Sequence, residues 1–320
     1  MRILMFAVND PAGAGMALCA ALSRHTECKA RLVTLETRYN HNFARDMHIP
    51  DLDAADLDEL ETLLRTSDVF HFHMTADEDT RFGPFLPKDH LRGKRVVHHH
   101  HGHPDFRGDP EKYRRKYRER QRRNLLVSTP DLLRLLPGAR WQPNAVPVDE
   151  AAYTPLAARP DGPLRIGQSP TNKALKNTEE FVRITDELAA MPRLPRNERL
   201  LIDNVPHKEC LRLKRTADIF FDHMQGYFGM SSLEALSQGV PTVAGLDDWN
   251  LEQVEDFAGL PAPWVIARDG DSLKRRLEEL LLDADARLHL GRRSRSFMES
   301  GWNDAKVARR LAEYYTGLDV

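Results

Sequence analysis

Short apolar runs alternate with amphipathic segments along most of the chain. Runs rich in Val, Ile, Leu and Phe predict buried strands, and apolar residues spaced three and four apart predict the helices between them. This order is typical of an α/β fold, in which helices cover both faces of a parallel sheet. In the first half, the expected strands are Arg2–Val8, Lys29–Leu35, Val69–His73, Arg95–His99 and Leu125–Ser128, and the expected helices are Gly15–Ser23, Ala55–Thr66, Glu111–Arg123 and Pro130–Leu136.

The segment between Pro143 and Pro163 is rich in proline, which predicts a linker. A second series of strands and helices begins after it, so we expect two Rossmann-like domains, 1–156 and 157–300, that face each other across a cleft. Further helices are expected over 270–282 and 302–315. The second series comprises the expected strands Leu164–Gln168, Arg199–Ile202, Ile219–Asp222 and Thr242–Ala244 and the expected helices Asn177–Met191, Lys208–Ala217 and Ser231–Gln238.

The composition is that of an ordinary globular protein. The 320 residues include 41% hydrophobic and 29% charged side chains, the net charge is -2, and the mean hydropathy is -0.54. The chain has no run of about 18 apolar residues, which a membrane helix needs, and its balanced charge argues against a general nucleic-acid binder. With 3 cysteines at no metal-type spacing and an N-terminal apolar run too short for a signal peptide, we expect reduced thiols and a cytoplasmic location.

A glycine-containing loop follows the first expected strand. It runs from Asp10 to Gly15, and Gly13 and Gly15 let the backbone approach a ligand closely. The helix that begins here directs free N–H groups and the positive end of its dipole at the loop, which favours an anion. A tight turn without a ligand is equally consistent with this spacing.

The segment Gly226–Val243 is a more specific candidate site. A strand meets a glycine-containing loop, Ser231 or Ser232 is expected to cap the next helix, and Glu234 lies near its start. Glu234 could accept hydrogen bonds from two ribose hydroxyls, or it could complete a capping box with Ser231. A diphosphate could bind the backbone N–H groups of Gly229, Met230, Ser231 and Ser232.

Two lysines follow the first strand of the second series. Lys173 and Lys176 are three residues apart, so a helical turn would place them on one face. There they could neutralise a diphosphate leaving group. They could equally be solvated surface lysines.

Four consecutive histidines, His98 to His101, end another expected strand. Because side chains alternate along a strand, His99 and His101 face one side and His98 and His100 the other, so the run does not predict a metal site. Ligands bind beyond the carboxyl ends of strands in such sheets, and His101 there could orient a sugar hydroxyl.

The segment 111–123 is dense in lysine and arginine. A solvated helix with ion pairs explains it simply. Alternatively, it could make peripheral contact with an anionic membrane surface, which neutralising Arg114, Arg115, Arg118 and Arg122 would weaken.

Together these motifs resemble the GT-B glycosyltransferases, specifically the retaining family four, over nearly the whole chain. The resemblance implies transfer of a sugar from a nucleotide-sugar to a glycan or lipid-linked acceptor, without a metal or other cofactor, as in polysaccharide biosynthesis. It also implies that the C-terminal helix, 301–320, packs back on the first domain. The catalytic roles implied are those of His101, Lys176 and Glu234. The donor-binding residues implied are Gly13, Gly15, Gln168, Lys173, Lys176, Val205, Gly229, Met230, Ser231, Ser232 and Glu234, and the residues implied near the acceptor or sugar are His103, Arg107, Asp222 and Gln225.

Two positions depart from the family pattern. Gly226 stands where the family's E-x7-E motif has its first Glu, and Gln168 stands where the family has its first basic donor residue. Asp222, His223 or Gln225 could approach the place of the missing Glu, and Lys173 could supply the missing positive charge. Two alternatives therefore stay open, a GT-B protein that binds a nucleotide-sugar or a partner without catalysis, and a sugar-nucleotide epimerase.

Overall fold

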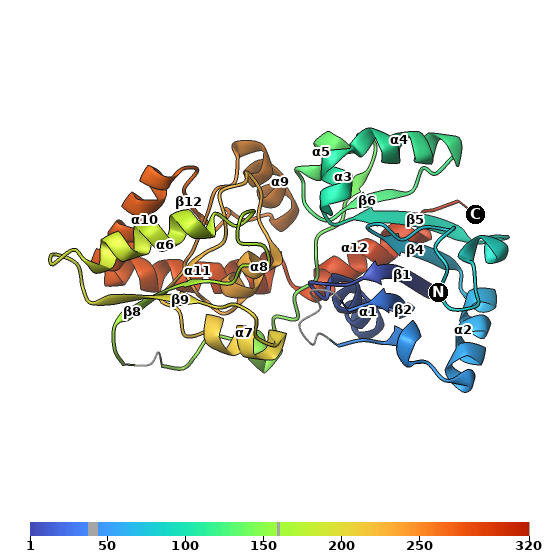
Figure 1. Ribbon diagram of the computed structural model, residues 1–320, viewed down its shortest axis with the longest axis horizontal. Coiled ribbons are helices and arrows are strands. Elements are labelled where there is room, and N and C mark those ends of the chain that lie inside the picture. Colours follow the sequence, from blue (N-terminus) through green and yellow to red (C-terminus); the bar gives the residue numbers. More distant parts are fainter. Residues whose placement is uncertain (38–43, 159–160, 320) are drawn as a thin grey trace. The chain divides into compact units, whose positions relative to one another are not determined.

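The computed structural model describes residues 1–37, 44–158 and 161–319 (Figure 1). The chain divides into two compact units, which we call unit 1, Met1–Ala145 with Asp304–Val320, and unit 2, Val146–Asn303. The division lies between Ala145 and Val146, whereas the proline-rich segment suggests a boundary between 156 and 157. Contacts explain the difference, because Arg295 of unit 2 donates hydrogen bonds to the Val148 and Tyr153 carbonyls.

Unit 1 is built on a parallel sheet of seven strands in the order β3-β2-β1-β4-β5-β6-β7 (Figure 1). Its central strands are continuous apolar or aromatic runs, as expected where helices cover both faces. The strands are β1 (Arg2–Asn9), β2 (Lys29–Glu36), β3 (Met47–His48), β4 (Val69–His73), β5 (Arg95–His100), β6 (Leu125–Val127) and β7 (Arg140–Trp141).

The helices of unit 1 cover two different faces of this sheet. On one face, Phe6, Phe70 and Phe72 pack with Leu60 and Leu64 of α2. On the other face α1 packs against α12, the last helix of the chain. The helices are α1 (Ala14–His25), α2 (Ala54–Thr66), α3 (Pro104–Gly108), α4 (Pro110–Glu119), α5 (Leu132–Leu135) and α12 (Asp304–Thr316), with short 3-10 turns at Ile49–Asp51 and Pro87–His90.

Unit 2 repeats the architecture with five parallel strands in the order β12-β11-β10-β8-β9. Phe181 and Leu188 of α6 pack with Leu273 and Leu277 of α10 over one face. The strands are β8 (Leu164–Gln168), β9 (Asn197–Leu201), β10 (Ile219–Phe221), β11 (Thr242–Ala244) and β12 (Val265–Ile266). The helices are α6 (Thr178–Ala189), α7 (His207–Lys214), α8 (Met230–Ser237), α9 (Asp248–Ala258), α10 (Gly270–Leu282) and α11 (Ala284–Gly301), with a 3-10 turn at Ala151–Tyr153.

Some expected helices differ from those observed. The basic helix ends at Glu119 rather than at residue 123, because Gln121 has a left-handed backbone with φ of 53°. The helix expected over 130–136 is reduced to Leu132–Leu135, and the sequence did not predict α9 or α11. In α11, Gly291 weakens the helical pattern, yet a Cβ there would lie 2.5 Å from the Gly239 carbonyl oxygen, so the close approach requires glycine.

Within the described ranges, no helix is both long enough and apolar enough to span a bilayer.

Candidate functional site

The candidate donor site of unit 2 lies where β8, β9 and β10 end. Gln168, the last residue of β8, donates hydrogen bonds through Nε2 to the Lys176 and Asp222 carbonyls. The Asn177 side chain, just before α6, accepts from the Met224 amide. These bonds hold the loops after β8 and β10 together at the carboxyl edge of the sheet, the usual ligand side of a parallel α/β sheet.

Asp222 is the centre of this edge. Its side chain is fully buried, and Oδ1 lies 2.5 Å from Lys176 Nζ. Oδ2 accepts from the Gly229 amide at 2.6 Å and from the Ser232 hydroxyl at 2.8 Å, while the Ser231 hydroxyl donates to Oδ1 at 2.9 Å. A buried carboxylate therefore lies at the start of α8, near the positive end of the helix dipole, which favours its negative charge.

The electrostatics keep Asp222 ionised. Burial alone would raise the pKa of this carboxyl, but His223 and Lys176 lower it well below its usual range. The Lys176 side chain remains 17% exposed, and its ammonium group has three N–H donors. Lys176 can thus bind Asp222 and still donate a hydrogen bond to a ligand.

Glu234 belongs to a second buried ion pair and does not interact with the start of α8. Its Oε1 lies 2.7 Å from His207 Nε2, and its Oε2 binds Nζ of the fully buried Lys214. Burial raises the pKa of Glu234, but Lys214 and His207 outweigh burial and lower it to about 2. The capping roles suggested for Ser231, Ser232 and Glu234 are wrong, because Gly229 is the N-cap residue of α8 and no side chain caps the helix. The two serine hydroxyls donate to Asp222 instead.

The other residues assigned to the donor lie on the same edge of unit 2. Lys173 is exposed and pairs with Asp203, in the loop after β9, at 2.5 Å. Val205 is half-buried in that same loop. Gln225 is exposed and donates to the Asn177 side chain at 3.2 Å. The loops thus bring Lys173, Val205 and Gln225 to the edge that Lys176 and Asp222 occupy.

Gly226 has a backbone that disfavours a glutamate. Its φ is +85°, in the left-handed region that favours glycine, and its carbonyl accepts from the Asp247 amide and the Asn250 side chain. A residue with a Cβ would be strained at this position. The backbone at position 226 therefore suits the glycine that stands in place of the motif's first Glu.

In the glycine loop of unit 1, the Asp10 side chain binds the first backbone amides of α1. The Asp10 carboxylate accepts from the Gly15 and Met16 amides, each at 3.1 Å, and Gly13 takes a left-handed φ of 65° before α1. Burial raises the pKa of Asp10 despite these backbone bonds. Two of the N–H groups at the start of α1 are therefore already hydrogen-bonded to Asp10.

His101, His103 and Arg107 lie at the carboxyl end of β5. Burial lowers the pKa of His101 to about 4, so its imidazole is neutral near pH 7. His103 precedes α3, and its Nδ1 accepts from the Asp105 amide at 3.2 Å. Arg107 pairs with Asp131 at 2.7 Å and donates to the Gly102 carbonyl.

Most of the basic side chains in segment 111–123 pair with carboxylates of unit 1. Lys116 binds Asp77, for example, and Arg122 binds the buried Glu78. The paired residues are Lys112, Arg114, Lys116, Arg118, Arg120 and Arg122. These pairs favour the simpler interpretation, a helix held by ion pairs on its own unit.

Sequence reasoning missed the charged partners of Glu234 and Lys173 in unit 2. Lys214 and His207 both lie on α7, and Asp203 lies in the loop before it. A lysine in an otherwise amphipathic helix gives no sign that it is fully buried. One feature does indicate that Lys214 is buried. It lies four residues after the half-buried Cys210, on the same helix face as the buried Leu211.

No family model matches the chain, and no curated protein matches it. The fold, however, is that of solved GT-B glycosyltransferases. HepE from Anabaena in complex with UDP aligns with a TM-score of 0.67 at 11% identity, over 99% of this chain and 100% of that chain. Sucrose-phosphate synthase from Thermosynechococcus elongatus aligns with a TM-score of 0.62 at 13% identity, over 99% and 98%. A glycosyltransferase from Rickettsia africae gives 0.64 at 10% identity, over 98% of each chain. At these identities the likeness defines the fold, two Rossmann-like domains of the GT-B class.

Proposed function

We propose that the protein is a glycosyltransferase that moves a sugar from a nucleoside-diphosphate sugar to a hydroxyl of a glycan or lipid-linked acceptor. The observation that carries this proposal is the buried pair of Lys176 and Asp222 beside the start of α8. Asp222 holds the ammonium group in place, and its remaining N–H donors can bind a diphosphate. Lys173, on the same loop, would add a second positive charge.

In the proposed reaction, the bond between the anomeric carbon and the β-phosphate oxygen breaks as the acceptor oxygen bonds to that carbon. The acceptor proton leaves with the nucleoside diphosphate. Lys176 and Lys173 would stabilise the negative charge that grows on the leaving group, so no metal on the diphosphate is needed. Retention at the anomeric carbon, ribose binding by Glu234 and a catalytic role for His101 are parts of this proposal that follow from the family resemblance.

The first test is thermal unfolding with a panel of uridine, guanosine and adenosine diphosphate sugars, since a ligand raises the melting temperature of the fold that binds it. UDP and UDP-glucose come first, because HepE was solved with both. We expect one donor to raise the melting temperature of the wild type and of Lys208→Gln, an exposed α7 lysine, but much less that of Lys176→Gln. Equal shifts in all three proteins, or none, would overturn the proposed donor site.

A second candidate is a GT-B protein that binds the nucleotide-sugar without transferring it. Gly226, with its left-handed backbone in place of the motif's first Glu, favours this candidate. Sugar transfer that His101→Ala abolishes would exclude it. Conversion of the donor's sugar without any acceptor would instead indicate an epimerase.

Contact with an anionic membrane through segment 111–123 is a separate proposal. Arg115 and Arg123 are the basic residues of this segment that make no ion pair in the described part of the chain. Salt-sensitive binding to anionic vesicles, weakened in Arg115→Gln/Arg123→Gln, would support it. Equal binding to neutral vesicles would contradict it.

A further inference from the structure

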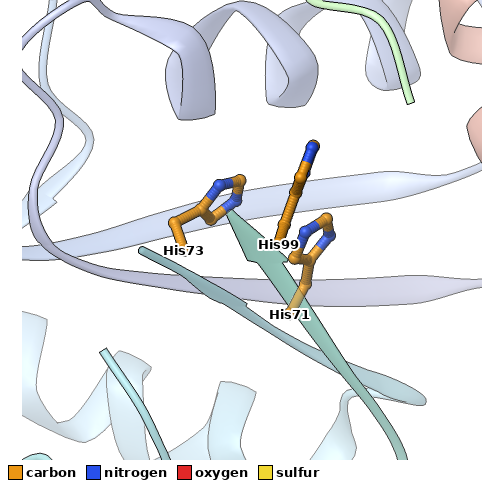
Figure 2. Close-up of side chains that lie close together, drawn as sticks. All are labelled: His71, His73 and His99. Atoms are coloured by element: carbon orange, nitrogen blue, oxygen red, sulfur yellow. The ribbon is translucent and has the colours of Figure 1, made fainter. Parts of the chain in front are cut away.

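Histidines from two neighbouring strands gather on the α1 and α12 side of the unit 1 sheet. We propose that His71, His73 and His99 bind one transition-metal ion of the class that prefers imidazole nitrogen, such as Zn²⁺ (Figure 2). The three histidines belong to unit 1, whereas the lysines and carboxylates of the proposed donor site belong to unit 2. His101, to which the proposed function gives a catalytic role, contacts His73, but the test below measures zinc binding and not sugar transfer. The inference therefore stands whether or not the protein transfers a sugar.

The sheet register places the three side chains together. His71 and His73 are two residues apart on β4, so they face the same side of the sheet. His73 is directly paired with His99 of β5, which puts the third ring beside the other two. Figure 2 shows the three imidazoles projecting from the same side of the strands. The run His98 to His101 alone could not predict this, because two of the three ligands come from β4.

The distances suit a small ion after a modest adjustment of the rings. One nitrogen from each of the three residues lies within 4.8 Å of the others. A tetrahedral ion with metal–nitrogen bonds of about 2.0–2.1 Å separates its ligand nitrogens by about 3.4 Å. The His71 and His73 rings are stacked with 7° between their planes, so they have to turn about χ2, a soft torsion, for their nitrogens to converge on one ion.

Several of these nitrogens have nothing else to bind. His71 Nε2 and both ring nitrogens of His99 are buried and lack a hydrogen-bond partner among the described residues. His73 Nε2 contacts only a weak acceptor, the Met5 thioether sulfur, at 3.3 Å. Buried polar atoms normally find partners, so a cluster of unpaired nitrogens calls for a ligand.

Two of the three rings, those of His71 and His73, have a hydrogen-bonding neighbour at Nδ1. The Tyr315 hydroxyl binds His71 Nδ1, and His101 Nε2 lies 2.8 Å from His73 Nδ1. Such contacts orient metal-binding histidines and set which nitrogen is free to bind. The Met5 sulfur, 3.3 Å from His73 Nε2, could act as a further ligand, and this soft sulfur, like the imidazoles, favours Zn²⁺ or copper over Mg²⁺ or Ca²⁺.

The test is metal retention by the full chain, prepared without a histidine tag. Protein stripped with a chelator is loaded with Zn²⁺, passed through a gel-filtration column and assayed for zinc by mass spectrometry. We expect the wild type to retain about one zinc per chain. When it is loaded with Mg²⁺ instead, we expect it to retain no magnesium. Co²⁺ should give the intense visible absorption of a tetrahedral nitrogen site.

The decisive variant is His99→Leu. Because neither nitrogen of His99 has a partner in the described ranges, leucine leaves no hydrogen-bonding group unpaired, and the variant should fold. The matched control is His100→Gln, on the same strand but the opposite face, where the glutamine amide can replace the contact of His100 Nε2 with the buried Tyr117 hydroxyl. We expect His99→Leu to lose its zinc and its cobalt absorption, and His100→Gln to keep both. A wild type that retains no zinc, or a His99→Leu that retains as much as the wild type, would overturn the proposal.

Discussion

Lys176 and Asp222 form a buried ion pair in unit 2, with 2.5 Å between Nζ and Oδ1, although 46 positions separate them in the sequence. The same carboxylate accepts a hydrogen bond from the amide of Gly229, the residue that precedes α8. One aspartate thus joins the end of β10, the loop after β8 and the start of a helix. This arrangement explains why the residues that bind a donor in the proposed function depend on one another for their positions.

Replacing Asp222 by Asn should destabilise the fold strongly. The substitution removes the charge that Lys176 faces and puts an amide group among N–H and O–H donors. Breaking a buried pair from one side costs about 3–5 kcal/mol, and the partial exposure of Lys176 suggests the lower end. Urea unfolding measures this cost. The control, Asp203→Asn, breaks the exposed pair with Lys173 and should change stability by less than about 1 kcal/mol. Similar losses in both variants would contradict the role given to Asp222.

Glu234 should make the protein sensitive to acid. Its pKa in the folded chain, about 2, is lower than the ordinary 4.5, so the unfolded chain binds more protons between these values. The stabilisation, on the order of 3 kcal/mol, is present above pH 4.5 and is lost as the pH falls toward 2.

The comparison of wild type with Glu234→Gln isolates this effect. The difference in unfolding free energy between the two proteins should be large at pH 6.5 and should shrink as the pH is lowered through 4.5 to 3.5. Glu209→Gln serves as the control, because Glu209 is paired with Arg212 on the surface, and its difference should stay small throughout. A Glu234→Gln difference that does not vary with pH would contradict the depressed pKa.

Much of the fold could be predicted from the sequence. The expected strands Val69–His73, Leu164–Gln168 and Thr242–Ala244 have the observed bounds, because buried parallel strands are short apolar runs flanked by polar or turn residues. The helix over 270–282 is also confirmed. The loops expected to carry the site follow β1, β8 and β10. They could be identified from the sequence because ligands bind at the carboxyl ends of parallel strands, and chain direction shows which end that is.

The partners inside the site could not be predicted in the same way. The sequence offers Lys176, Asp222 and Glu234 as separate candidates, but periodicity does not indicate which charges meet across a sheet. Lys214 is buried only because α7 turns it toward Glu234, which depends on tertiary packing. The histidine cluster of unit 1 depends likewise on the register of β4 with β5, which pairs His73 with His99.

Restoring a side chain at position 226 should destabilise unit 2 rather than repair the E-x7-E motif. Gly226 has φ of +85°, and an L-residue in the left-handed region costs about 1–2 kcal/mol. Gly226→Ala should therefore lower the urea midpoint, and Gly226→Glu should lower it at least as much without improving donor binding. In the control Gly108→Ala, no described atom lies within 4 Å of the new Cβ and φ is outside that region, so stability should hardly change. Tighter donor binding by Gly226→Glu would contradict this account.

Tyr315 is expected to set the strength of the proposed metal site without binding the metal itself. Its hydroxyl bonds His71 Nδ1, which leaves Nε2 as the nitrogen that faces the ion. Tyr315→Phe keeps the buried ring but removes that bond, and the loss of such an orienting contact typically weakens metal affinity about 10–100-fold. Competition with a chromophoric chelator measures the affinity for Zn²⁺. Tyr314→Phe alters the neighbouring ring, which lies against Arg140, and should leave the affinity unchanged. If Tyr315→Phe binds Zn²⁺ as tightly as the wild type while retaining one zinc per chain, the ion sits on other nitrogens than those proposed.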